Sequence, residues 1–509
     1  MDSEVLIVGA GPCGLALALW LTILGVKLRI VDRSPASGLA SRAFALQART
    51  LELYDRIGVA REAIARGRPI SAMTVHLPHK AAQRIPFGNL GRGLSPFPYV
   101  LILLQDDHEK LLIDHLVAAG VVVERNTEVV DLESHGGRVR ARLKGPHSVD
   151  QTCEAAYVCG CDGAGSTVRE LMGIGFPGGS SGEVFYVADV QAKGPLADGE
   201  LHYIMAGDDV CSIFPLRGAG RLRLIGLVPR EVREVQLDFS FADVCGRLLS
   251  DAGLEVSMVE SFAAYRVHQR IAAEWRRGRV FLLGDASHVH SPAGGQGLNA
   301  GVGDAANLAW KLAAVLAGEA DAGLLATYQS ERLAAARQIA ATADWGFALQ
   351  SGRGGPMGLV RQALAALAPG LMGLKPVRQA AFRALSQLAV NYRSTGTCEG
   401  QAGRVAGGDR LPWVRLTGAT SNLEPLRGVG WQAQVYGEAG QALRAACAEW
   451  GLSLHSFAWA PEMARAGLAR NAVYLVRPDG YVAYAAGQDP AGLAAYLARF
   501  AIRFTAPDG

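Results

Sequence analysis

Residues 280–312, VFLLGDASHVHSPAGGQGLNAGVGDAANLAWKL, form the stretch that decides the fold of this 509-residue chain. Its first four residues are apolar and predict a short buried strand, which ends before Asp285. A glycine-rich loop is expected over residues 291–303, and Asp304 is expected to cap the helix that follows, which is expected to continue as an alanine-rich helix through residues 313–350. A strand, a glycine loop and a helix N-terminus in this order bring backbone N–H groups together around an electron-rich ligand.

The glycines and Asp285 indicate what kind of ligand this loop can hold. Glycine has no side chain, so Gly294, Gly295 and Gly297 allow a flat ring system to lie against the backbone. Asp285 stands at the carboxyl end of the strand, where its carboxylate can accept hydrogen bonds from sugar or polyol hydroxyls. A glycine-rich lid over another kind of site, or a plain turn, is the alternative that this stretch leaves open.

A second nucleotide-binding pattern opens the chain. Residues 5–8 predict a buried strand, and Gly9-Ala10-Gly11-Pro12-Cys13-Gly14 completes a G-x-G-x-x-G before a helical pattern. A further strand over residues 27–31 ends at Asp32, 21 residues after Gly11, where an acid can bind ribose hydroxyls. The glycine motif alone is weak, but with both strands, the helix and the acid it predicts a dinucleotide site. The expected contacts are Gly9, Gly11, Gly14, Asp32 and Arg33.

Composition excludes several classes of function. The formal net charge is +3 and 19% of the residues are charged, so nothing favours a nucleic-acid partner. The eight cysteines are scattered without zinc-site spacing, which predicts a reduced, cytoplasmic protein without a metal. Residues 5–26 are almost continuously apolar, but Asp2 and Glu4 precede them and glycines interrupt them. This pattern disfavours a signal peptide or a membrane span.

Residues 280–312 resemble the second flavin-binding motif of the single-component (group A) flavoprotein aromatic hydroxylases. That family includes para-hydroxybenzoate hydroxylase, phenol hydroxylase and the aromatic polyketide hydroxylases. Two other segments are similar to motifs of the family: Ser41-Arg42-Ala43, which matches a segment that contacts the pyrophosphate and the moving flavin, and Asp162-Gly163, which matches its Asp-Gly motif. Within residues 280–312 the resemblance is carried by Gly284-Asp285, Pro292, Gly294, Gly297-Leu298-Asn299, Asp304 and residues 307–312.

The resemblance implies that the cofactor is FAD, and it assigns the contacts. Asp285 and Gln105 would bind the ribityl chain, and the loop around Pro292 would lie against the flavin ring. The expected catalytic residues are Arg42, Pro292 and His290, with a solvated loop arginine and a structural histidine as the alternatives for Arg42 and His290. The expected FAD-binding residues are Gly9, Gly11, Gly14, Asp32, Arg33, Arg42, Gln105, Asp162, Asp285, Pro292, Gly295, Gly297, Leu298 and Asn299.

The same resemblance implies the reaction. NADH or NADPH would reduce the flavin, and dioxygen would then form a flavin C4a-hydroperoxide that hydroxylates a phenolic or polycyclic, polyketide-like aromatic substrate. The chain has no second G-x-G-x-x-G with a strand and an acid, which agrees with a family whose nicotinamide has no domain of its own. Tyr203, Phe214 and Arg217 are expected to line the substrate site, with ordinary sheet packing as the alternative for each.

Together these patterns predict an α/β fold with a Rossmann-like FAD-binding domain over residues 1–175 and 276–350. A substrate-binding sheet domain is expected over residues 176–275, and a helical segment over 351–395 that covers the substrate or forms the face of a homodimer. Within residues 396–509, strands are expected over residues 432–436 and 473–476, and this part of the chain resembles the thioredoxin-like tail of phenol hydroxylase and the polyketide hydroxylases. A working thioredoxin needs C-x-x-C, and this tail has only Cys398 and Cys447, so its role is expected to be structural.

Other functions stay open on the sequence. A Baeyer–Villiger or epoxidising monooxygenase would share the fold, and a flavin-bound protein that sequesters an aromatic drug would share the binding motifs. A halogenase is disfavoured because the W-x-W-x-I-P motif of halogenases has no counterpart here. No two tryptophans stand two residues apart. His288 and His290 form an H-x-H, yet no third metal ligand is placed, and a flavin explains this loop better.

Overall fold

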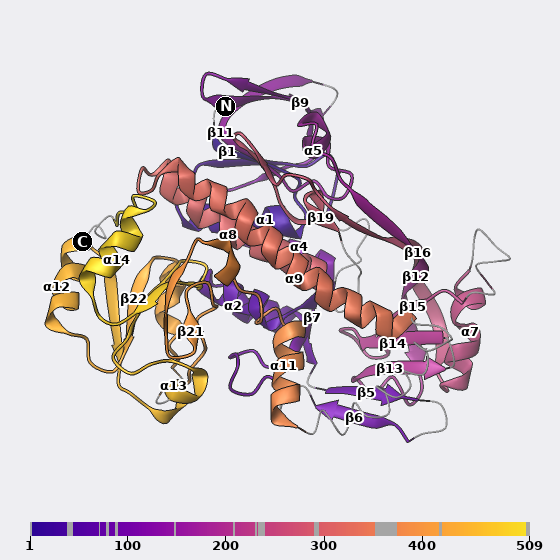
Figure 1. Cartoon of the computed structure of the whole chain (residues 1–509). Coiled ribbons are helices and arrows are strands. Elements are labelled where there is room, and N and C mark those ends of the chain that lie inside the picture. The colour runs from indigo at the N-terminus through magenta and orange to yellow at the C-terminus, as the bar shows by residue number, and fades with distance from the viewer. Residues whose placement is uncertain are drawn as a thin grey trace.

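The computed structural model describes residues 3–37, 44–70, 72–77, 81–86, 90–146, 149–206, 209–229, 232, 240–289, 295–351, 374–416 and 420–504. The chain has a mixed α/β fold in which three larger sheets surround two long helices, α8 (Gln296–Leu316) and α9 (Ala326–Ser351) (Figure 1). None of the described helices is long and apolar enough to cross a membrane.

The first sheet, at the top of Figure 1, has a parallel core of β18, β11, β1, β2 and β8, in that order. Helix α1 (Pro12–Ile23) connects β1 to its parallel neighbour β2, and Val5, Leu6 and Ile7 of β1 are fully buried. A strand covered on both faces reads as a continuous apolar run, as β1 does. The strands are β1 (Ser3–Val8), β2 (Leu28–Val31), β8 (Val123–Glu124), β11 (Asp150–Gly160), β17 (Arg276–Arg277) and β18 (Val280–Leu282), with β9 (Glu128–His135) and β10 (Arg138–Lys144) joined to β11.

The second sheet, at the lower right of Figure 1, has the order β19-β16-β12-β15-β14-β13-β5-β6. It takes the β5–β6 hairpin from early in the chain, and helix α7 (Phe241–Asp251) covers one face. The sequence reading missed α7, although Ser240 and Asp243 form a capping box that marks its start. The strands are β5 (Ala72–His76), β6 (Gln83–Pro86), β12 (Gly178–Lys193), β13 (Leu201–Ala206), β14 (Asp209–Pro215), β15 (Arg221–Leu227), β16 (Glu255–Ile271) and β19 (His288–Val289).

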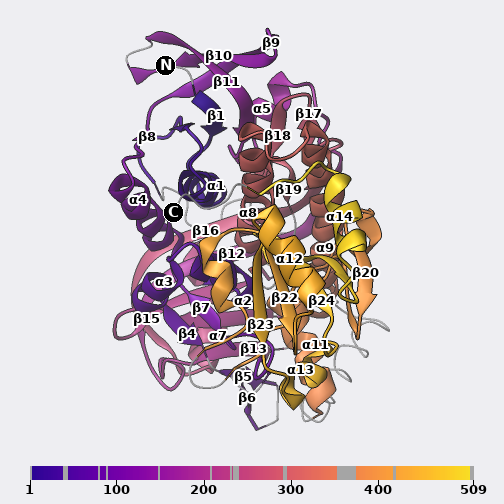
Figure 2. The same cartoon turned by 90° about the vertical axis from the view of Figure 1, so that its left-hand side faces the viewer.

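The third sheet is built from the C-terminal part of the chain and faces the viewer in Figure 2, in the order β21-β20-β25-β24-β22-β23. The predicted strands at β22 and β24 are confirmed, and Gly480 (φ +77°) closes the turn after β24. The strands are β20 (Glu399–Ala402), β21 (Val405–Ala406), β22 (Gln432–Tyr436), β23 (Ser453–Phe457), β24 (Val473–Val476) and β25 (Val482–Ala486), with helices α12 (Gln441–Trp450), α13 (Pro461–Ala466) and α14 (Pro490–Ala498).

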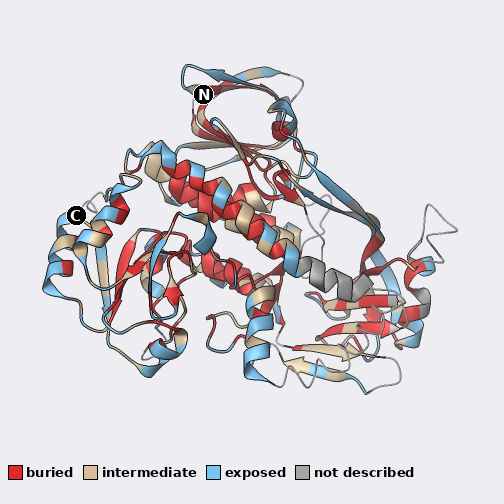
Figure 3. Cartoon of the chain, viewed as in Figure 1, coloured by how far each residue is buried: buried red, intermediate tan, exposed pale blue. Residues whose placement is uncertain are grey.

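Shorter elements fill the space between the sheets and the central helices. A small sheet of the order β3-β7-β4 contacts helix α3 through β4, and α4 packs against α1. Figure 3 shows buried residues concentrated where the central helices meet the surrounding sheets. These elements are β3 (Ala45–Leu46), β4 (Arg68–Ile70), β7 (Val100–Ile102), α2 (Ala48–Arg56), α3 (Ala60–Arg66), α4 (Gln105–Ala118), α5 (Thr167–Leu171) and α11 (Lys375–Leu385).

The central helices differ from the sequence prediction in where they begin and end. Helix α8 begins at Gln296 and its N-cap is Gly295 (φ +62°), so the prediction that Asp304 caps this helix is wrong. Gly301 and Gly303 therefore lie within a helix, where they allow close packing of neighbouring side chains. The helix expected to continue through residues 313–350 is interrupted between α8 and α9, where Gly318 has φ +72°. Residues 352–373 of the expected helical segment lie outside the described residues.

Candidate functional site

The three glycines of the loop after β1, Gly9, Gly11 and Gly14, have different roles. A Cβ atom on Gly9 would lie 2.5 Å from the carbonyl oxygen of Cys161, and one on Gly14 would lie 1.9 Å from the carbonyl oxygen of Gly9. Both positions therefore need glycine for the chain to pack on itself. A Cβ on Gly11 would meet no atom within 4 Å, so the backbone there is open to an approaching ligand. This is the division of roles that a dinucleotide pyrophosphate requires.

The N-terminus of α1 is suited to an anion. Its N-cap is Gly11, no side chain caps it, and no acidic residue stands in its first turn, so its N–H groups and its positive dipole end are available. Asp32 at the end of β2 lies beside this loop, because its carboxylate accepts hydrogen bonds from the backbone N–H groups of Ala10 (2.6 Å) and Ser34 (2.7 Å). A carboxylate has about four lone-pair sites, so Asp32 can still accept hydroxyl donors. Arg33 is exposed.

The second glycine loop lies directly against the first. A Cβ on Gly284 (φ +58°) would lie 3.2 Å from the Cβ of Cys13, and one on Gly301 would lie 3.3 Å from it. The Sγ of Cys13 donates a hydrogen bond to the carbonyl oxygen of Gly301 at 3.2 Å. Contact with Cys161 and burial raise the pKa of the Cys13 thiol, which keeps it protonated as a donor. Asp285, next to Gly284, is exposed and so accessible to a ligand.

Asp304 holds this second loop from within α8. Its buried carboxylate accepts hydrogen bonds from the backbone N–H of Gly284 (3.0 Å), from Nε2 of His288 (2.9 Å) and from Nε of Arg332 (2.6 Å). Burial by itself would raise the pKa of Asp304, but Arg332 and His288 outweigh that effect and lower it. The residue is therefore a charged anchor for the loop rather than a helix cap.

The third predicted flavin-binding loop contains Asp162. Its carboxylate accepts hydrogen bonds from Ser166 Oγ (2.5 Å) and from the backbone N–H of Val168 (3.0 Å), and burial raises its pKa. Arg169 donates to the carbonyl oxygens of Ala164 (2.8 Å) and Ala286 (3.0 Å). Arg169 thereby ties the Asp162 loop to the loop that contains Asp285, so the three predicted flavin loops meet.

Two residues that were predicted to contact the flavin, Asn299 and Gln105, form side-chain hydrogen bonds to other residues of the protein. Asn299 is buried, and its Oδ1 accepts from the Gln47 backbone (2.8 Å) and Thr50 Oγ1 (2.6 Å) while its Nδ2 donates to Ala45 and Gly295 carbonyl oxygens. The Asn299 side chain thus fastens the start of α8 to β3 and α2. Gln105 is the first residue of α4, and its Nε2 donates to Glu109 at 2.8 Å.

Leu298 and Gly297 lie in the first turn of α8, both half-buried. The three residues expected to be catalytic, Arg42, Pro292 and His290, lie outside the described residues. Their roles stay predictions.

The expected substrate residues divide into two groups. Phe214 is half-buried and meets Phe44 in an edge-to-face contact with ring centroids 4.6 Å apart. Tyr203, on the adjacent strand β13, is also half-buried. Arg217 is exposed, and its Nη1 lies 3.4 Å from the carbonyl oxygen of Arg66. The structure therefore gathers Phe44 and Phe214 in one apolar cluster and leaves Arg217 on the surface.

Arg223 is a residue that the sequence reading missed. It lies opposite Phe214 on β15, is 2% exposed, and pairs with both carboxylate oxygens of Asp189 at 2.6 and 2.7 Å. Its guanidinium carbon lies 5.3 Å from the Phe44 ring centroid, and its Nη1 has no hydrogen-bond partner among the described residues. A charged residue between two leucines of a strand, Arg223 in RLRLIGL, is the signal that would have found it.

Comparison with known proteins gives consistent matches over most of the chain. Residues 2–343 match a family described as the FAD binding domain, and residues 405–502 match one described as the aromatic-ring hydroxylase C-terminal domain. The chain is 36% identical to the 6-methylpretetramide 4-monooxygenase of Streptomyces rimosus, over 79% of this chain and 72% of that protein. It is 32% identical to the pentachlorophenol 4-monooxygenase of Sphingobium chlorophenolicum, over 82% and 76%.

Among solved structures, the flavin-dependent monooxygenase PieE in complex with FAD and substrate matches with a TM-score of 0.80. The two chains are 26% identical, and the match covers 98% of this chain and 99% of the other.

Proposed function

This chain belongs to the FAD-dependent aromatic-ring hydroxylases, and we propose that it hydroxylates a phenolic or polycyclic aromatic molecule with NADH or NADPH and dioxygen. The observation that carries this proposal is the meeting of the two glycine loops at Cys13, which places the open backbone of Gly11 beside the loop of Asp285. The named activities of its relatives, on 6-methylpretetramide and on pentachlorophenol, support a ring-bearing substrate.

The residues of the three loops fit FAD. The Gly11 backbone and the N-terminus of α1 would hold the pyrophosphate, Asp32 the ribose, and Asp285 with Gln105 the ribityl chain. The N-terminal turn of α8, with Gly295, Gly297 and Leu298, would present its positive end to the electron-rich edge of the flavin ring. When bound, FAD supplies hydride acceptance from the nicotinamide and the activation of dioxygen.

The described residues indicate what the protein itself contributes. The apolar cluster around Phe44 and Phe214 would exclude water from the reacting atoms. The Nη1 of Arg223 would donate a hydrogen bond to an oxygen of the substrate, because it is the unsatisfied end of a buried guanidinium. Tyr203 would complete the lining, and Arg42, Pro292 and His290 keep the catalytic roles that the family resemblance implies. Arg217 lies exposed and is less well placed for contact with substrate.

The fold supports the assignment of different roles to successive parts of the chain. We assign residues 1–175 and 276–350 to a Rossmann-like FAD-binding domain, because β1, α1 and β2 form a parallel β-α-β unit and β18 returns to the same sheet. Residues 176–275 would form the substrate-binding sheet, to which β5 and β6 also contribute. Residues 351–395 would be a helical segment, and residues 396–509 a thioredoxin-like module without a redox role.

Substrate-stimulated oxidation of the nicotinamide tests this function. The purified protein should be yellow, release one FAD per chain on heating, and oxidise NADPH or NADH faster when a true phenolic substrate is added. The product should gain one oxygen atom on an intact aromatic ring. A ring-expanded ester or an epoxide would instead identify a Baeyer–Villiger or epoxidising enzyme. Tight binding of an aromatic compound without any stimulated oxidation would identify a binding protein.

A further inference from the structure

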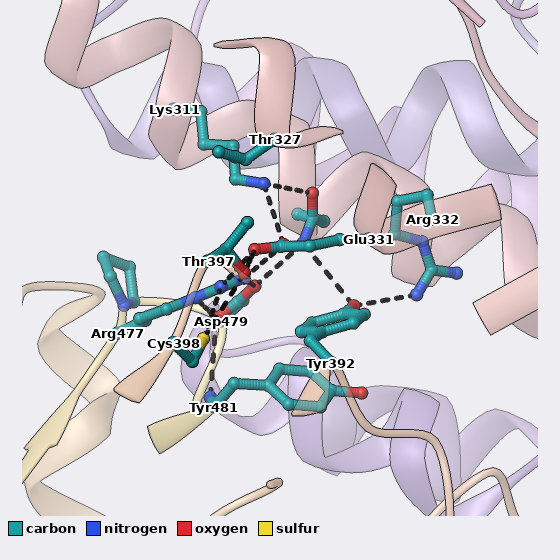
Figure 4. A network of polar contacts seen from close by, with 12 residues as sticks. Lys311, Thr327, Glu331, Arg332, Tyr392, Thr397, Cys398, Arg477, Asp479 and Tyr481 are labelled. Carbon is teal, nitrogen blue, oxygen red and sulfur yellow. Dashed lines mark hydrogen bonds and ion pairs between the residues drawn. The ribbon is translucent and has the colours of Figure 1, made fainter. Parts of the chain in front are cut away.

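A buried polar network joins the C-terminal sheet to the helices of the flavin site (Figure 4). Its members come from α8, from α9, from the segment after α11 and from the turn that follows β24. Each of them is 7% exposed or less, so the network has almost no access to solvent. We define the interdomain network as Asp304, Asn307, Lys311, Glu331, Arg332, Tyr392, Thr397, Arg477 and Asp479.

The C-terminal half of the network is a set of balanced charges. Arg477 donates to both carboxylate oxygens of Asp479 (3.0 and 2.5 Å) and to both of Glu331 (2.8 and 2.9 Å). Lys311 donates to Glu331 at 2.8 Å, and burial lowers the pKa of Lys311 to about 8. Burial by itself would raise the pKa of Glu331, but Arg477 and Lys311 hold it well below its usual range. The carboxylates of Glu331 and Asp479 are thus balanced by the cations of Lys311 and Arg477.

From this charged centre five successive contacts lead to the flavin loop. Asn307 of α8 lies 3.3 Å from Asp479 and 3.5 Å from the hydroxyl of Tyr392. Arg332 donates to the same hydroxyl at 3.0 Å, and its Nε donates to Asp304 at 2.6 Å. Asp304 in turn accepts the backbone N–H of Gly284 at 3.0 Å. In Figure 4 the hydroxyl of Tyr392 points to Arg332 on one side and to the charged centre on the other.

We propose that the Arg477–Asp479 turn of the C-terminal module is a positioning element for the loop of Gly284 and Asp285, acting through Tyr392, Arg332 and Asp304. The effect of this positioning role on FAD affinity rests on the proposed function. Its effect on how firmly the loop of Gly284 and Asp285 is held does not. Because the Gly284 N–H and Arg332 share the carboxylate of Asp304, a change in the orientation of Arg332 alters the anchor of the loop.

The alternative is that the network only holds two parts of the chain together. A second interdomain contact offers a matched control, because Arg427 pairs with Asp55 of α2 at 3.1 Å. The side chain of Arg427 is 54% exposed, and the carboxylates it pairs with, Asp55 and Glu424, are not members of the network. Arg427→Gln therefore removes an interdomain ion pair without touching Asp304, whereas Tyr392→Phe removes one hydroxyl and leaves every charge paired.

The decisive experiment is hydrogen–deuterium exchange of FAD-free protein, followed through a peptide that covers residues 283–289. In Tyr392→Phe the Gly284 amide should exchange about threefold to tenfold faster than in wild type, the effect of one hydrogen bond. FAD should dissociate from this variant with a Kd higher by a similar factor. Arg427→Gln should change neither quantity, although both variants should lower the Tm. Asp479→Asn, if it folds, should reproduce the exchange result.

Two results would separate the hypotheses. Unchanged exchange and unchanged FAD affinity in folded Tyr392→Phe would overturn the positioning role, even if the wild-type enzyme hydroxylates its substrate. A wild-type protein that binds no FAD would overturn the proposed function, and the exchange of the Gly284 amide would then still decide whether the turn positions the loop. Faster exchange in Arg427→Gln to the same extent would also overturn the proposal, because any loosening of the interface would then suffice.

Discussion

Cys13 and Gly301 are 288 positions apart in the sequence, yet the thiol of Cys13 donates a hydrogen bond to the Gly301 carbonyl oxygen at 3.2 Å. One residue belongs to the first turn of α1 and the other to α8, so this contact brings two helix N-termini together. Glycine at position 301 makes the approach possible, since a Cβ there would crowd the Cys13 side chain at 3.3 Å. A ligand with a pyrophosphate and a flat ring can therefore contact both helices at once.

Gly14→Ala and Gly11→Ala should act in different ways. The added Cβ at position 14 would lie 1.9 Å from a backbone oxygen, so the FAD-free protein should lose about 1–3 kcal/mol of stability or fail to fold. The Cβ at position 11 meets only open space, so the FAD-free Tm should stay within a few degrees of wild type while the FAD Kd rises about tenfold or more. Calorimetry and fluorescence titration measure the two quantities. Equal effects of both substitutions would contradict the assigned roles.

Asp285→Ala should weaken FAD binding by about tenfold to a hundredfold, because a hydrogen bond to a charged acceptor contributes about 1.5–3 kcal/mol. Asp285 is exposed, so the fold should tolerate the change. Asp285→Asn, which keeps one acceptor oxygen, should fall between Ala and wild type. An FAD Kd equal to that of wild type in Asp285→Ala would remove this residue from the site.

Arg223→Lys should raise the KM for the aromatic substrate about tenfold to a hundredfold and leave the FAD content unchanged. Lysine keeps a cation beside Asp189 but cannot present the unpaired Nη1 near Phe44. The matched control is Arg217→Gln, which changes an exposed arginine of the same sheet region and should leave the KM near wild type. Steady-state kinetics decide the matter, and the reverse ranking of the two variants would support the original expectation for Arg217.

The stability of the FAD-free protein should fall below about pH 4.3, the ordinary pKa of a glutamate. Glu331 has a lowered pKa in the folded chain, so the unfolded chain takes up the proton first as the pH falls. The stability that Glu331 contributes is thus fully present above about pH 4.3 and is lost toward its folded pKa. Thermal unfolding between about pH 6 and pH 3 should show a shallower decline in Glu331→Gln than in wild type. Glu462→Gln, at an exposed carboxylate, should decline as wild type does.

Replacing Cys398 and Cys447 together by Ser should leave coupled hydroxylation intact. Cys447 is buried, and Cys398 lies 3.8 Å from Arg477 at the edge of the interdomain network. Neither forms a disulfide in the structure, and 49 residues separate them in the sequence. Product formation per NADPH consumed is the measurement. A large fall in this ratio, with the FAD content unchanged, would indicate that the C-terminal cysteines take part in electron transfer.

The sequence by itself determined the local chemistry of the site. The G-x-G-x-x-G with Asp32, and the Gly284-Asp285 stretch, predicted two nucleotide-binding loops because glycine positions and strand ends follow from short-range geometry. The strands at 432–436 and 473–476 were also predicted correctly, since their apolar runs are bounded by turn residues. The family resemblance identified the cofactor, and the comparisons confirm the family.

Only the tertiary structure decided which partners within the protein these residues have. Asp304 looked like a helix cap, but long-range contacts with Arg332 and His288 make it a buried anchor inside α8. Asn299 was predicted as a flavin contact from its motif, and the tertiary structure adds that its amide oxygen accepts hydrogen bonds from Gln47 and Thr50. The sequence around Arg223, and around each member of the interdomain network, does not indicate which residues these side chains pair with. A buried charge is stable only where its partners converge, and these partners come from segments far apart in the chain.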